Sequence, residues 1–324
     1  MSRRSTKPTM PVRTSHRVKS TNKYHVATAT LAALGLALCV MVSLTVTSVG
    51  SDATTTTIPK FKAQPNPEYP VGTSDSAEPS GYSPPSTSAL PGFDQTYVND
   101  FVGSTLPAGW DIFTGIPSGD PGGHFGGSHV RVGGGMLQLL TYKDAQWHDH
   151  WVTGGLCQCG LAQTYGAYFV RSRVSGPGPN EAELLWPQQS VWPPELDFGE
   201  TGGSTTELSA SLHYGATNHN NQRFLGINMT KWHTWGVIWT PTRITYTVDG
   251  QIWGSVSVLS EIPKIPMTLD IEQRTKCSSG EECPTRPIAL QIDWVAEYTP
   301  NAVTSNVMAP RLTLRNQPRA RGSL

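Results

Sequence analysis

The sequence predicts an all-β protein built as a two-sheet antiparallel sandwich. Residues 244–248 alternate strictly between apolar and polar side chains, and Asp249-Gly250 then supplies a two-residue hairpin turn. Residues 267–273 and 288–294 repeat the alternation. Beyond the N-terminal part, no segment shows a sustained helical period of 3.6 residues. Many short strands without helices are typical of an antiparallel sandwich.

The N-terminal part of the chain predicts export. Residues 1–25 carry seven Lys and Arg and no acid, and residues 26–49 contain no charge. This apolar run exceeds the hydrophobic region of a usual signal peptide and is long enough to span a bilayer. Because a basic flank stays in the cytoplasm, we expect a cytoplasmic leader at 1–25, a signal peptide or signal anchor at 26–49, and the remainder outside. Cleavage would give a secreted protein, and no cleavage a membrane-anchored one.

Two further segments have the composition of irregular chain. Residues 50–93 combine a TTTT run with scattered Pro, Ser and Gly and few large apolar side chains. Such a segment cannot bury enough surface to offset its ordering entropy. We therefore expect a flexible linker at 50–93, a folded domain at 94–299 and an irregular tail at 300–324.

Within the predicted domain, the strands follow one another closely. Residues 129–140, HVRVGGGMLQLL, indicate two strands around a glycine turn. In the last alternating segment, one face is predicted to carry Ile288, Leu290, Ile292 and Trp294.

The distribution of charge disfavours nucleic acid as a partner. The formal net charge is zero, with 24 basic and 24 acidic residues. The leader holds seven of the basic residues and the tail holds four, which leaves 13 against all 24 acids in between. Such a body would repel a phosphate backbone but not a neutral polysaccharide. We expect a monomer.

The cysteines agree with an oxidising compartment. Cys39 lies in the apolar run, and four more lie in the domain: Cys157, Cys159, Cys277 and Cys283. Four cysteines allow three pairings. The preferred bond joins Cys277 to Cys283 around the polar SSGEE loop. This choice leaves a Cys157–Cys159 bond, which closes a cramped ring. The crossed pairings are the alternative. A zinc site is disfavoured because no His lies at ligand spacing near either pair.

The candidate catalytic stretch is residues 191–200, VWPPELDFGE. In a strand, Glu195 and Asp197 point to one face, and the apolar residues that alternate with them point to the other. Glu200 has the parity of the apolar face, where an unpaired charge is costly. A β-bulge at Phe198–Gly199 would return Glu200 to the carboxylate face, and glycine accepts bulge geometry most easily. The sequence therefore predicts three carboxylates in a row on one open face.

The spacing of these acids suits glycoside hydrolysis. Over four ladder steps, the Cα atoms of Glu195 and Glu200 lie about 13 Å apart, so that side chains leaning together bring their carboxyls to roughly 5–6 Å. Retaining enzymes have a separation of about 5–5.5 Å, one carboxylate serving as nucleophile and the other as acid/base. Asp197 between them would share a proton and separate the charges. The alternative is a solvated acidic edge strand.

The motif resembles the active-site strand of glycoside hydrolase family 16. WPPELDFGE is similar to the longer, E-x-D-x-x-E form of that strand, which laminarinases, agarases and carrageenases have. Its companions are TYGAYFVRSRV at 164–174, LLWP at 184–187, LHYG at 212–215, KWHTWGVIWTPTRITYTVDG at 231–250 and QIDWVAEY at 291–298. The resemblance covers about residues 94–299 and implies a jelly roll with a concave substrate cleft.

The resemblance also implies an exported, retaining endo-β-glycanase. Glu195 would attack the anomeric carbon, Glu200 would protonate the leaving oxygen and then act as base, and Asp197 would tune the pair. A sulfated galactan is disfavoured because the cleft segments lack a basic cluster, so we expect a β-1,3 or mixed β-1,3/1,4 glucan. No cofactor is expected. Family members often bind a structural calcium, for which this sequence shows no sharp ligand motif.

Aromatic residues are the second signal of a substrate groove, because sugar rings stack on tryptophan. By resemblance, Trp186 and Trp192 face the cleft, and His213 hydrogen-bonds the acid cluster. Three more tryptophans lie in loop-like stretches: Trp110, Trp147 and Trp151. They would extend the groove, and core or rim packing is the equal alternative for each.

Two other functions fit the same residues. A cell-wall transglycosylase of the same family would pass the glycosyl unit to another sugar, and products longer than the starting oligosaccharide would distinguish it. A non-catalytic glycan-binding module belongs to a different class, since jelly rolls commonly bind sugars and a fold does not fix a function. The presence of all three carboxylates disfavours the binding module.

Overall fold

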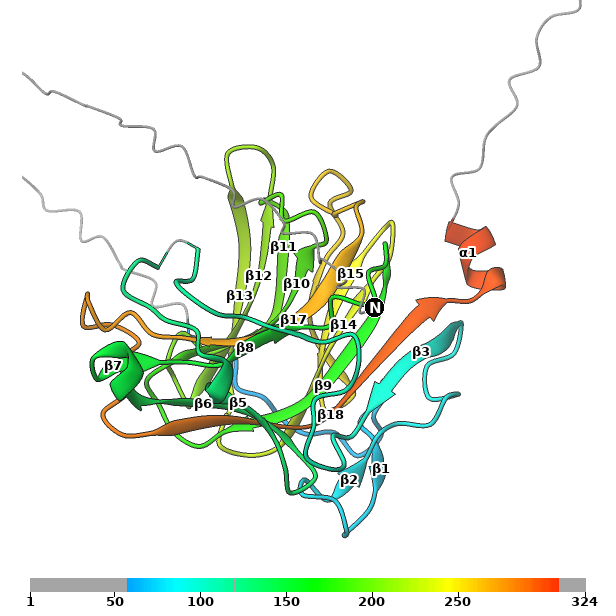
Figure 1. Ribbon diagram of the computed structural model, residues 1–324. Helices are drawn as coiled ribbons and strands as arrows, with labels where there is room; N and C mark the ends of the chain where they lie inside the picture. The colour runs from blue at the N-terminus through cyan, green and yellow to red at the C-terminus, as the bar shows by residue number, and fades with distance from the viewer. Residues whose placement is uncertain (1–56, 119, 309–324) are drawn as a thin grey trace, which may run out of the picture. The chain divides into compact units, whose positions relative to one another are not determined.

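The structure, a computed structural model, describes residues 57–118 and 120–308, which form an antiparallel β-sandwich of two large sheets (Figure 1). The all-β fold class predicted from alternation and turns is confirmed. The predicted leader and apolar run at 1–49 lie outside the described residues, as do 50–56 and 309–324. Within the described ranges, no helix is both long and apolar enough to cross a membrane.

The first sheet has seven strands in the described part of the chain, in the order β13-β12-β11-β10-β17-β8-β4. They are β4 (Asp111–Ile112), β8 (Gly155–Cys157), β10 (Asn180–Pro187), β11 (Glu195–Glu200), β12 (Glu207–Tyr214), β13 (His219–Gly226) and β17 (Met267–Arg274). All neighbours in this sheet pair antiparallel. The candidate catalytic strand β11 is therefore held between β10 and β12.

The second sheet follows the order β16-β15-β14-β9-β18-β6-β5, with β3 beside β18 and β7 beside β6. Its strands are β3 (Phe93–Asn99), β5 (Val130–Val132), β6 (Leu137–Asp144), β7 (His150–Val152), β9 (Gly166–Val174), β14 (His233–Trp239), β15 (Ile244–Val248), β16 (Gln251–Val256) and β18 (Ile288–Pro300). The remaining elements are β1 (Thr73–Ser74), β2 (Tyr82–Ser83), the 3-10 helices η1 (Gly127–His129) and η2 (Ala145–Trp147), and α1 (Ala302–Met308). The predicted Asp249-Gly250 turn joins β15 to β16, whereas α1 replaces the start of the predicted irregular tail.

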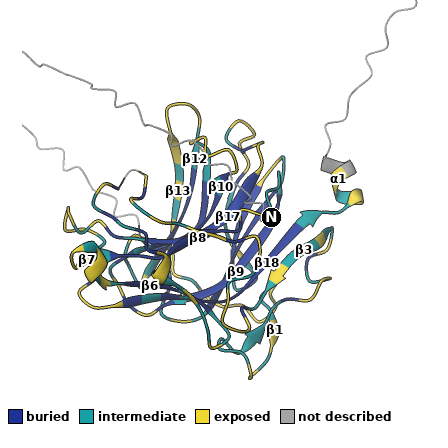
Figure 2. Ribbon diagram, in the orientation of Figure 1, coloured by how far each residue is buried: buried dark blue, intermediate teal, exposed yellow. Residues whose placement is uncertain are grey.

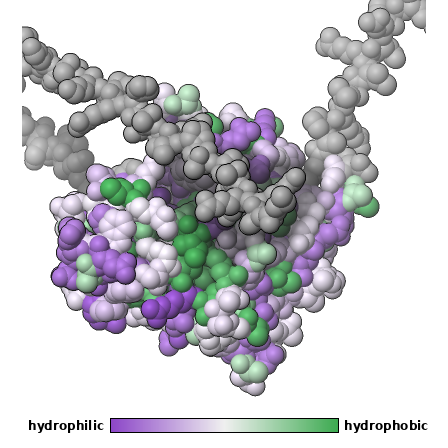
Figure 3. Space-filling view, viewed as in Figure 1, coloured by the Kyte–Doolittle hydropathy of each residue, from purple (hydrophilic) through white to green (hydrophobic). Residues whose placement is uncertain are grey.

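The main apolar layer lies between the two sheets. Leu196 and Phe198 enter it from β11, and Trp235 and Trp239 enter it from β14, all without exposed surface. Figure 2 shows the buried residues along the strands of both sheets and the exposed ones in the loops. On the face drawn in Figure 3, apolar residues gather toward the middle and hydrophilic ones toward the margins.

Strand β18 departs from the predicted alternation near its middle. Ile292 pairs with Ser172 and Trp294 with Arg171, so Asp293 is one residue too many relative to β9. Ile292 faces the layer between the sheets, but Trp294 belongs to a second apolar cluster. The prediction that Trp294 shares a face with the preceding apolar residues is wrong, because a register shift of one residue inverts the parity of all that follows.

Residues 57–93 pack on the sandwich, so the predicted flexible linker is wrong over this range. Leu90 is buried in the second apolar cluster with Trp294. The guanidinium of Arg171 donates to the carbonyl oxygen of Ser80 at 3.2 Å. Composition alone predicted irregular chain, but the outer face of β9 and β18 is apolar and needs a cover.

The preferred disulfide bond and the bond that it leaves are both present. Cys277 is bonded to Cys283, and Cys157 to Cys159. The crossed pairings are thereby excluded.

A buried carboxyl, Glu297 of β18, stands between two tyrosines. Tyr168 and Tyr97 are its register partners on the neighbouring strands. Glu297 has no exposed surface, and neither of its carboxyl oxygens has a hydrogen-bond partner among the described residues. Burial raises the pKa of Glu297 from 4.5 to about 8.

We expect the free energy of unfolding to fall between pH 5 and pH 8.5 because of Glu297. The folded state keeps this proton to about pH 8, whereas the unfolded chain releases it near pH 4.5. The stabilisation is fully present below pH 4.5 and is lost as the pH rises through 8. Because each unit of pKa difference corresponds to about 1.4 kcal/mol, the free energy of unfolding should fall by a few kcal/mol. Urea midpoints at both pH values measure the loss. Glu297→Gln, which cannot ionise, should lose less stability over this range, and an equal slope in both proteins would contradict the assignment.

Candidate active site

The three predicted acids lie on one face of β11. Glu195 and Glu200 are half-buried at the ends of the strand, and Asp197 is buried between them. The side chains of Leu196 and Phe198 point the other way, into the layer between the sheets. The strand therefore separates a carboxylate face from an apolar face, as the alternation predicted.

The predicted bulge is present at Phe198–Gly199. On β10, Leu184 pairs with Asp197 and the adjacent Glu183 pairs with Gly199, so that Phe198 has no register partner. The pairing with β12 shifts over the same stretch. The extra residue returns Glu200 to the carboxylate face.

The reason for the glycine differs from the one predicted. Gly199 does not have a positive φ, so no unusual backbone conformation requires it. A Cβ atom at this position would instead overlap Oε2 of Glu183. At Gly199, the side chain of Glu183 on the neighbouring strand occupies the space that a Cβ atom would enter.

Glu195 is bonded to a tryptophan of its own motif. The indole Nε1 of Trp192 donates to Oε2 of Glu195 at 2.7 Å. Burial raises the pKa of Glu195, and the Trp192 hydrogen bond opposes that rise because it favours the charged carboxylate.

Asp197 and His213 face each other across β11 and β12. The Nε2 atom of His213 lies 3.9 Å from Oδ2 of Asp197, and its Nδ1 atom lies 2.8 Å from Oδ1 of Asn218. Burial, together with the adjacent Glu195 and Glu200, raises the pKa of Asp197 well above its usual range. Asp197 therefore holds a proton under conditions in which an exposed aspartate has lost it. The structure thus brings His213 to the acid cluster.

Glu200 is held by three side chains that the sequence reasoning missed. The amide of Asn180 donates to Oε1 of Glu200 at 3.0 Å. The hydroxyls of Ser209 and Ser211 donate to its Oε2 at 3.3 and 3.5 Å. The two serines share the parity of His213 on β12, a signal that was available in the sequence. Asn180 carried no such signal, since its position depends on how β10 pairs with β11.

A cavity of about 530 Å³ lies on the same face and ends at Glu195. Its lining residues are Phe113, Ser118, Phe125, Cys157, Cys159, Leu184, Trp186, Pro187, Gln188, Ser190, Trp192, Glu195, Thr268, Asp270, Glu272 and Arg274. Trp186 and Trp192 thus border the cavity, as expected, while their contact with substrate stays a prediction. A groove of this size with aromatic walls and a few polar groups is typical of a ligand site.

Strand β17 contributes a polar row to the cavity that the sequence reasoning also missed. Asp270 accepts a hydrogen bond from the hydroxyl of Thr268 at 3.0 Å, and Glu272 forms an ion pair with Arg274. Burial raises the pKa of Asp270 well above its usual range, and Arg274 opposes a similar rise at Glu272. The alternation of residues 267–273 already placed these side chains opposite the apolar face, so the pattern could have found them.

Three of the predicted groove tryptophans do not line this cavity: Trp110, Trp147 and Trp151. Trp110 is buried in the core, where its indole donates to the hydroxyl of Tyr97 at 2.8 Å. Trp147, on η2, stacks on His124 with the ring centroids 4.6 Å apart. A tryptophan in a loop-like stretch can pack inward when the loop crosses the end of a sandwich, and at Trp110 this alternative holds.

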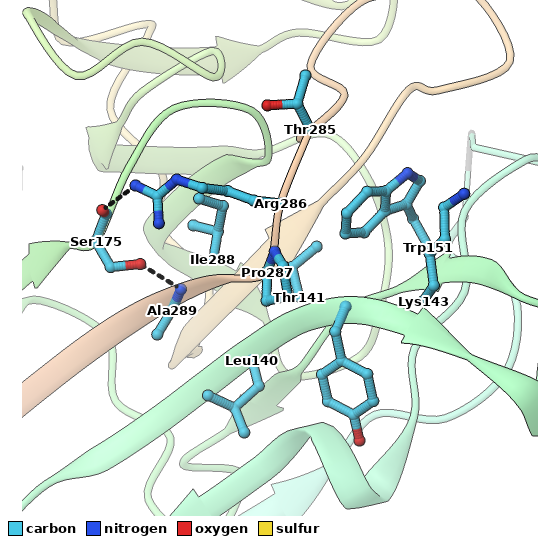
Figure 4. A pocket seen from close by; sticks show the side chains of 11 residues that line it. Leu140, Thr141, Lys143, Trp151, Ser175, Thr285, Arg286, Pro287, Ile288 and Ala289 are labelled. Atoms are coloured by element: carbon cyan, nitrogen blue, oxygen red, sulfur yellow. Dashed lines mark hydrogen bonds between the residues drawn. The ribbon is translucent and has the colours of Figure 1, made fainter.

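Trp151 lines a different pocket, of about 700 Å³, beside β6 and the start of β18 (Figure 4). Arg286 turns toward Ser175 on one side of that pocket and donates to its carbonyl oxygen at 3.0 Å, while Trp151 stands on the other side. None of the described residues that line it is a carboxylate. The smaller cavity beside β11 is therefore the candidate active site.

One group in this site has the donor types of a metal site. Glu195, Asp197 and His213 offer oxygen and nitrogen atoms within 4.8 Å of one another. The Glu195 carboxylate is already bonded to Trp192, and the raised pKa of Asp197 favours its protonated form. This arrangement suits proton chemistry, and a structural calcium elsewhere stays a prediction.

Comparisons with known proteins agree on one family. The model of glycosyl hydrolases family 16 matches residues 123–296, more than half of the chain. A β-glucanase of Rhodothermus marinus is 28% identical over 182 residues, which cover 48% of this chain and 61% of that protein. The chain thus spans about three fifths of the length of this curated relative.

Solved structures show the same fold. The laminarinase of Rhodothermus marinus has a TM-score of 0.57 at 22% identity, over 64% of this chain and 98% of that one. The catalytic domain of an endo-1,3-β-glucanase from Thermotoga petrophila has a TM-score of 0.53 at 16% identity, with the same coverage.

Proposed function

The chain belongs to glycosyl hydrolases family 16, and from this premise we propose that it is an exported endo-β-glucanase that hydrolyses its substrate with retention of configuration. One observation carries the proposal. Glu195, Asp197 and Glu200 stand in a row on the open face of β11, at the end of a cavity bordered by tryptophans.

In the proposed reaction, the two outer acids have different roles. Glu195 attacks the anomeric carbon and forms a glycosyl-enzyme, while Glu200 gives its proton to the oxygen of the departing sugar. Glu200 then takes a proton from water, and the resulting hydroxide displaces Glu195. Each step inverts the anomeric carbon, so two steps retain its configuration.

The surroundings of the row support these roles. The Trp192 indole holds Glu195 in one orientation and favours its charged form, which a nucleophile needs. Asp197 lies between the two glutamates, and its raised pKa favours the neutral form, which separates them without adding a third negative charge.

Trp192→Phe tests the contact with Glu195. Without the indole donor, the pKa of Glu195 should rise further, since that hydrogen bond lowers it. The nucleophile then takes up a proton at a higher pH, so kcat/KM should fall several-fold more at pH 5 than at pH 7. Profiles of kcat/KM against pH for both proteins measure the effect. A uniform loss at all pH values would mean that Trp192 acts only by packing or by contact with the sugar.

The charge of the site supports a neutral substrate. Among the described residues, the acid row and the cavity lining together hold five carboxyls and one guanidinium, that of Arg274. A sulfated or uronic polymer would meet more acids than bases there. Bringing its anionic groups next to these carboxyls, away from water, is unfavourable. The relatives are named as a β-glucanase, a laminarinase and an endo-1,3-β-glucanase. We therefore place a β-1,3 or mixed β-1,3/1,4 glucan first.

Export rests on the sequence and on the two disulfides. The apolar run at 26–49 follows a basic leader, and the bonds Cys157–Cys159 and Cys277–Cys283 suit an oxidising compartment. The protein would be secreted, or anchored with the domain outside the cell. External protease added to intact cells of the host should degrade an anchored domain, and a cytosolic domain with reduced cysteines would overturn this part.

A panel of polysaccharides tests the activity itself. Reducing ends should appear from laminarin or a mixed-linkage glucan and not from carrageenan or agarose. Proton NMR of the first product should show the β anomer before mutarotation, and an initial α anomer would contradict retention. Products longer than the starting oligosaccharide would identify a transglycosylase, and binding without new reducing ends a non-catalytic module.

A further inference from the structure

A carboxyl that the proposed reaction does not use lies directly behind the bulge of β11. Glu183 of β10 points into the layer between the sheets and is 2% exposed. In register it stands opposite Gly199, and a Cβ atom on that glycine would overlap its Oε2. The Glu183 carboxyl therefore occupies the space that a side chain at the bulge would need.

Glu183 is tied to the opposite sheet. The hydroxyl of Ser172 on β9 donates to its Oε1 at 2.6 Å. The same hydroxyl accepts a hydrogen bond from the indole of Trp235 on β14 at 3.0 Å. A short polar chain thus runs from Trp235 through Ser172 to the Glu183 carboxyl, which lies against Gly199.

Filling this space with a carboxyl is energetically unfavourable. Burial raises the pKa of Glu183 to about 7, whereas an apolar side chain would not bear this cost. Glu181, on the same face of β10, is also buried, but it is bonded to Gln273 of the same sheet and has no register partner within β11. The feature specific to Glu183 is its contact with Gly199.

Strand β10 consequently holds Glu200 from both faces of the sheet. On the cavity face, Asn180 donates to the Glu200 carboxylate. On the core face, Glu183 abuts the bulge that sets the direction of the Glu200 side chain. We propose that Glu183 is a positioning residue, which fixes the Gly199 bulge and thereby aims Glu200 at the oxygen of the departing sugar. This inference rests on the proposed acid/base role of Glu200.

Glu183→Ala tests the inference through its dependence on the leaving group. A displacement of about 1 Å can cost about 100-fold in rate, so kcat on the polymer should fall 10- to 100-fold with KM nearly unchanged. On a 2,4-dinitrophenyl glycoside, kcat/KM reports a step that needs no proton from Glu200, and it should fall less than threefold. If Glu183 only supports folding, the variant should lose activity on both substrates to the same extent.

Three variants complete the experiment. Glu297→Ala removes a buried carboxyl from β18, between β3 and β9 of the other sheet, and it should leave the ratio of the two activities as in the wild type. Glu183→Gln keeps an acceptor for Ser172 and should restore most of the polymer activity. Gly199→Ala would displace the Glu183 carboxyl by adding a Cβ atom beside it, so this variant should show the same leaving-group dependence as Glu183→Ala. It tests the inference even if Glu183→Ala does not fold.

The possible outcomes separate the two proposals. Loss on the polymer alone, in Glu183→Ala or Gly199→Ala, supports positioning. Equal loss on both substrates, or none, overturns the role of Glu183 and leaves the proposed function intact. A wild-type protein that cleaves neither substrate overturns the proposed function, and the inference with it.

Discussion

Glu195→Ala should abolish turnover of polymer and of activated aryl glycosides alike. Without this carboxylate no glycosyl-enzyme forms, and a good leaving group does not replace a missing nucleophile. We expect a loss of about 10⁴-fold or more, as is typical when a nucleophile is removed. Reducing-sugar release and dinitrophenolate release measure the two substrates, and circular dichroism confirms that the variant is folded.

Azide makes the same variant a test of stereochemistry. The small anion fits the space vacated in Glu195→Ala and attacks the anomeric carbon directly, with Glu200 still able to protonate the departing sugar. A single displacement should restore turnover and give an α-glycosyl azide from a β-glycoside. A β-glycosyl azide would mean that the roles of Glu195 and Glu200 are exchanged.

Glu200→Ala should fail in a different way, because it keeps the nucleophile and lacks only proton transfer. Polymer hydrolysis should fall about 10²–10⁴-fold, which is the usual contribution of a general acid/base. A 2,4-dinitrophenyl glycoside should keep most of its kcat/KM, since its leaving group needs no proton. Product analysis with both substrates separates these effects.

Azide again provides the control for Glu200→Ala. It replaces water in the second step, where the missing base would have been needed, and the product should be a β-glycosyl azide of retained configuration. If neither alanine variant slows hydrolysis of the polymer, β11 is not the catalytic strand.

Strand alternation could predict the acid row because parity is a local property. The positions of Glu195, Asp197 and Glu200 followed from a period of two and from the cost of burying an unpaired charge. The same reasoning extends to Ser209, Ser211 and the row on β17, where it was not applied. It failed at Trp294, because one extra residue in β18 reverses the face of everything beyond it.

Other features depended on contacts between distant segments. Asn180 reaches Glu200 only because β10 pairs with β11, and Trp110 is buried in the core, where it meets the distant hydroxyl of Tyr97. Residues 57–93 have the composition of a linker, yet they cover an apolar face that becomes visible once β9 and β18 are side by side. Composition describes a segment by itself and not the surface on which it docks.

The contact of Gly199 with Glu183 bears on how this site could be moved between proteins. The ten residues from Val191 to Glu200 contain all three acids, but the shape of their backbone is shared with a neighbouring strand. A graft of this segment onto another sandwich would carry the acids without the carboxyl that the glycine accommodates. A functional graft therefore needs the whole hairpin of β10 and β11. It also needs a hydroxyl in the place of Ser172 to hold the Glu183 carboxyl.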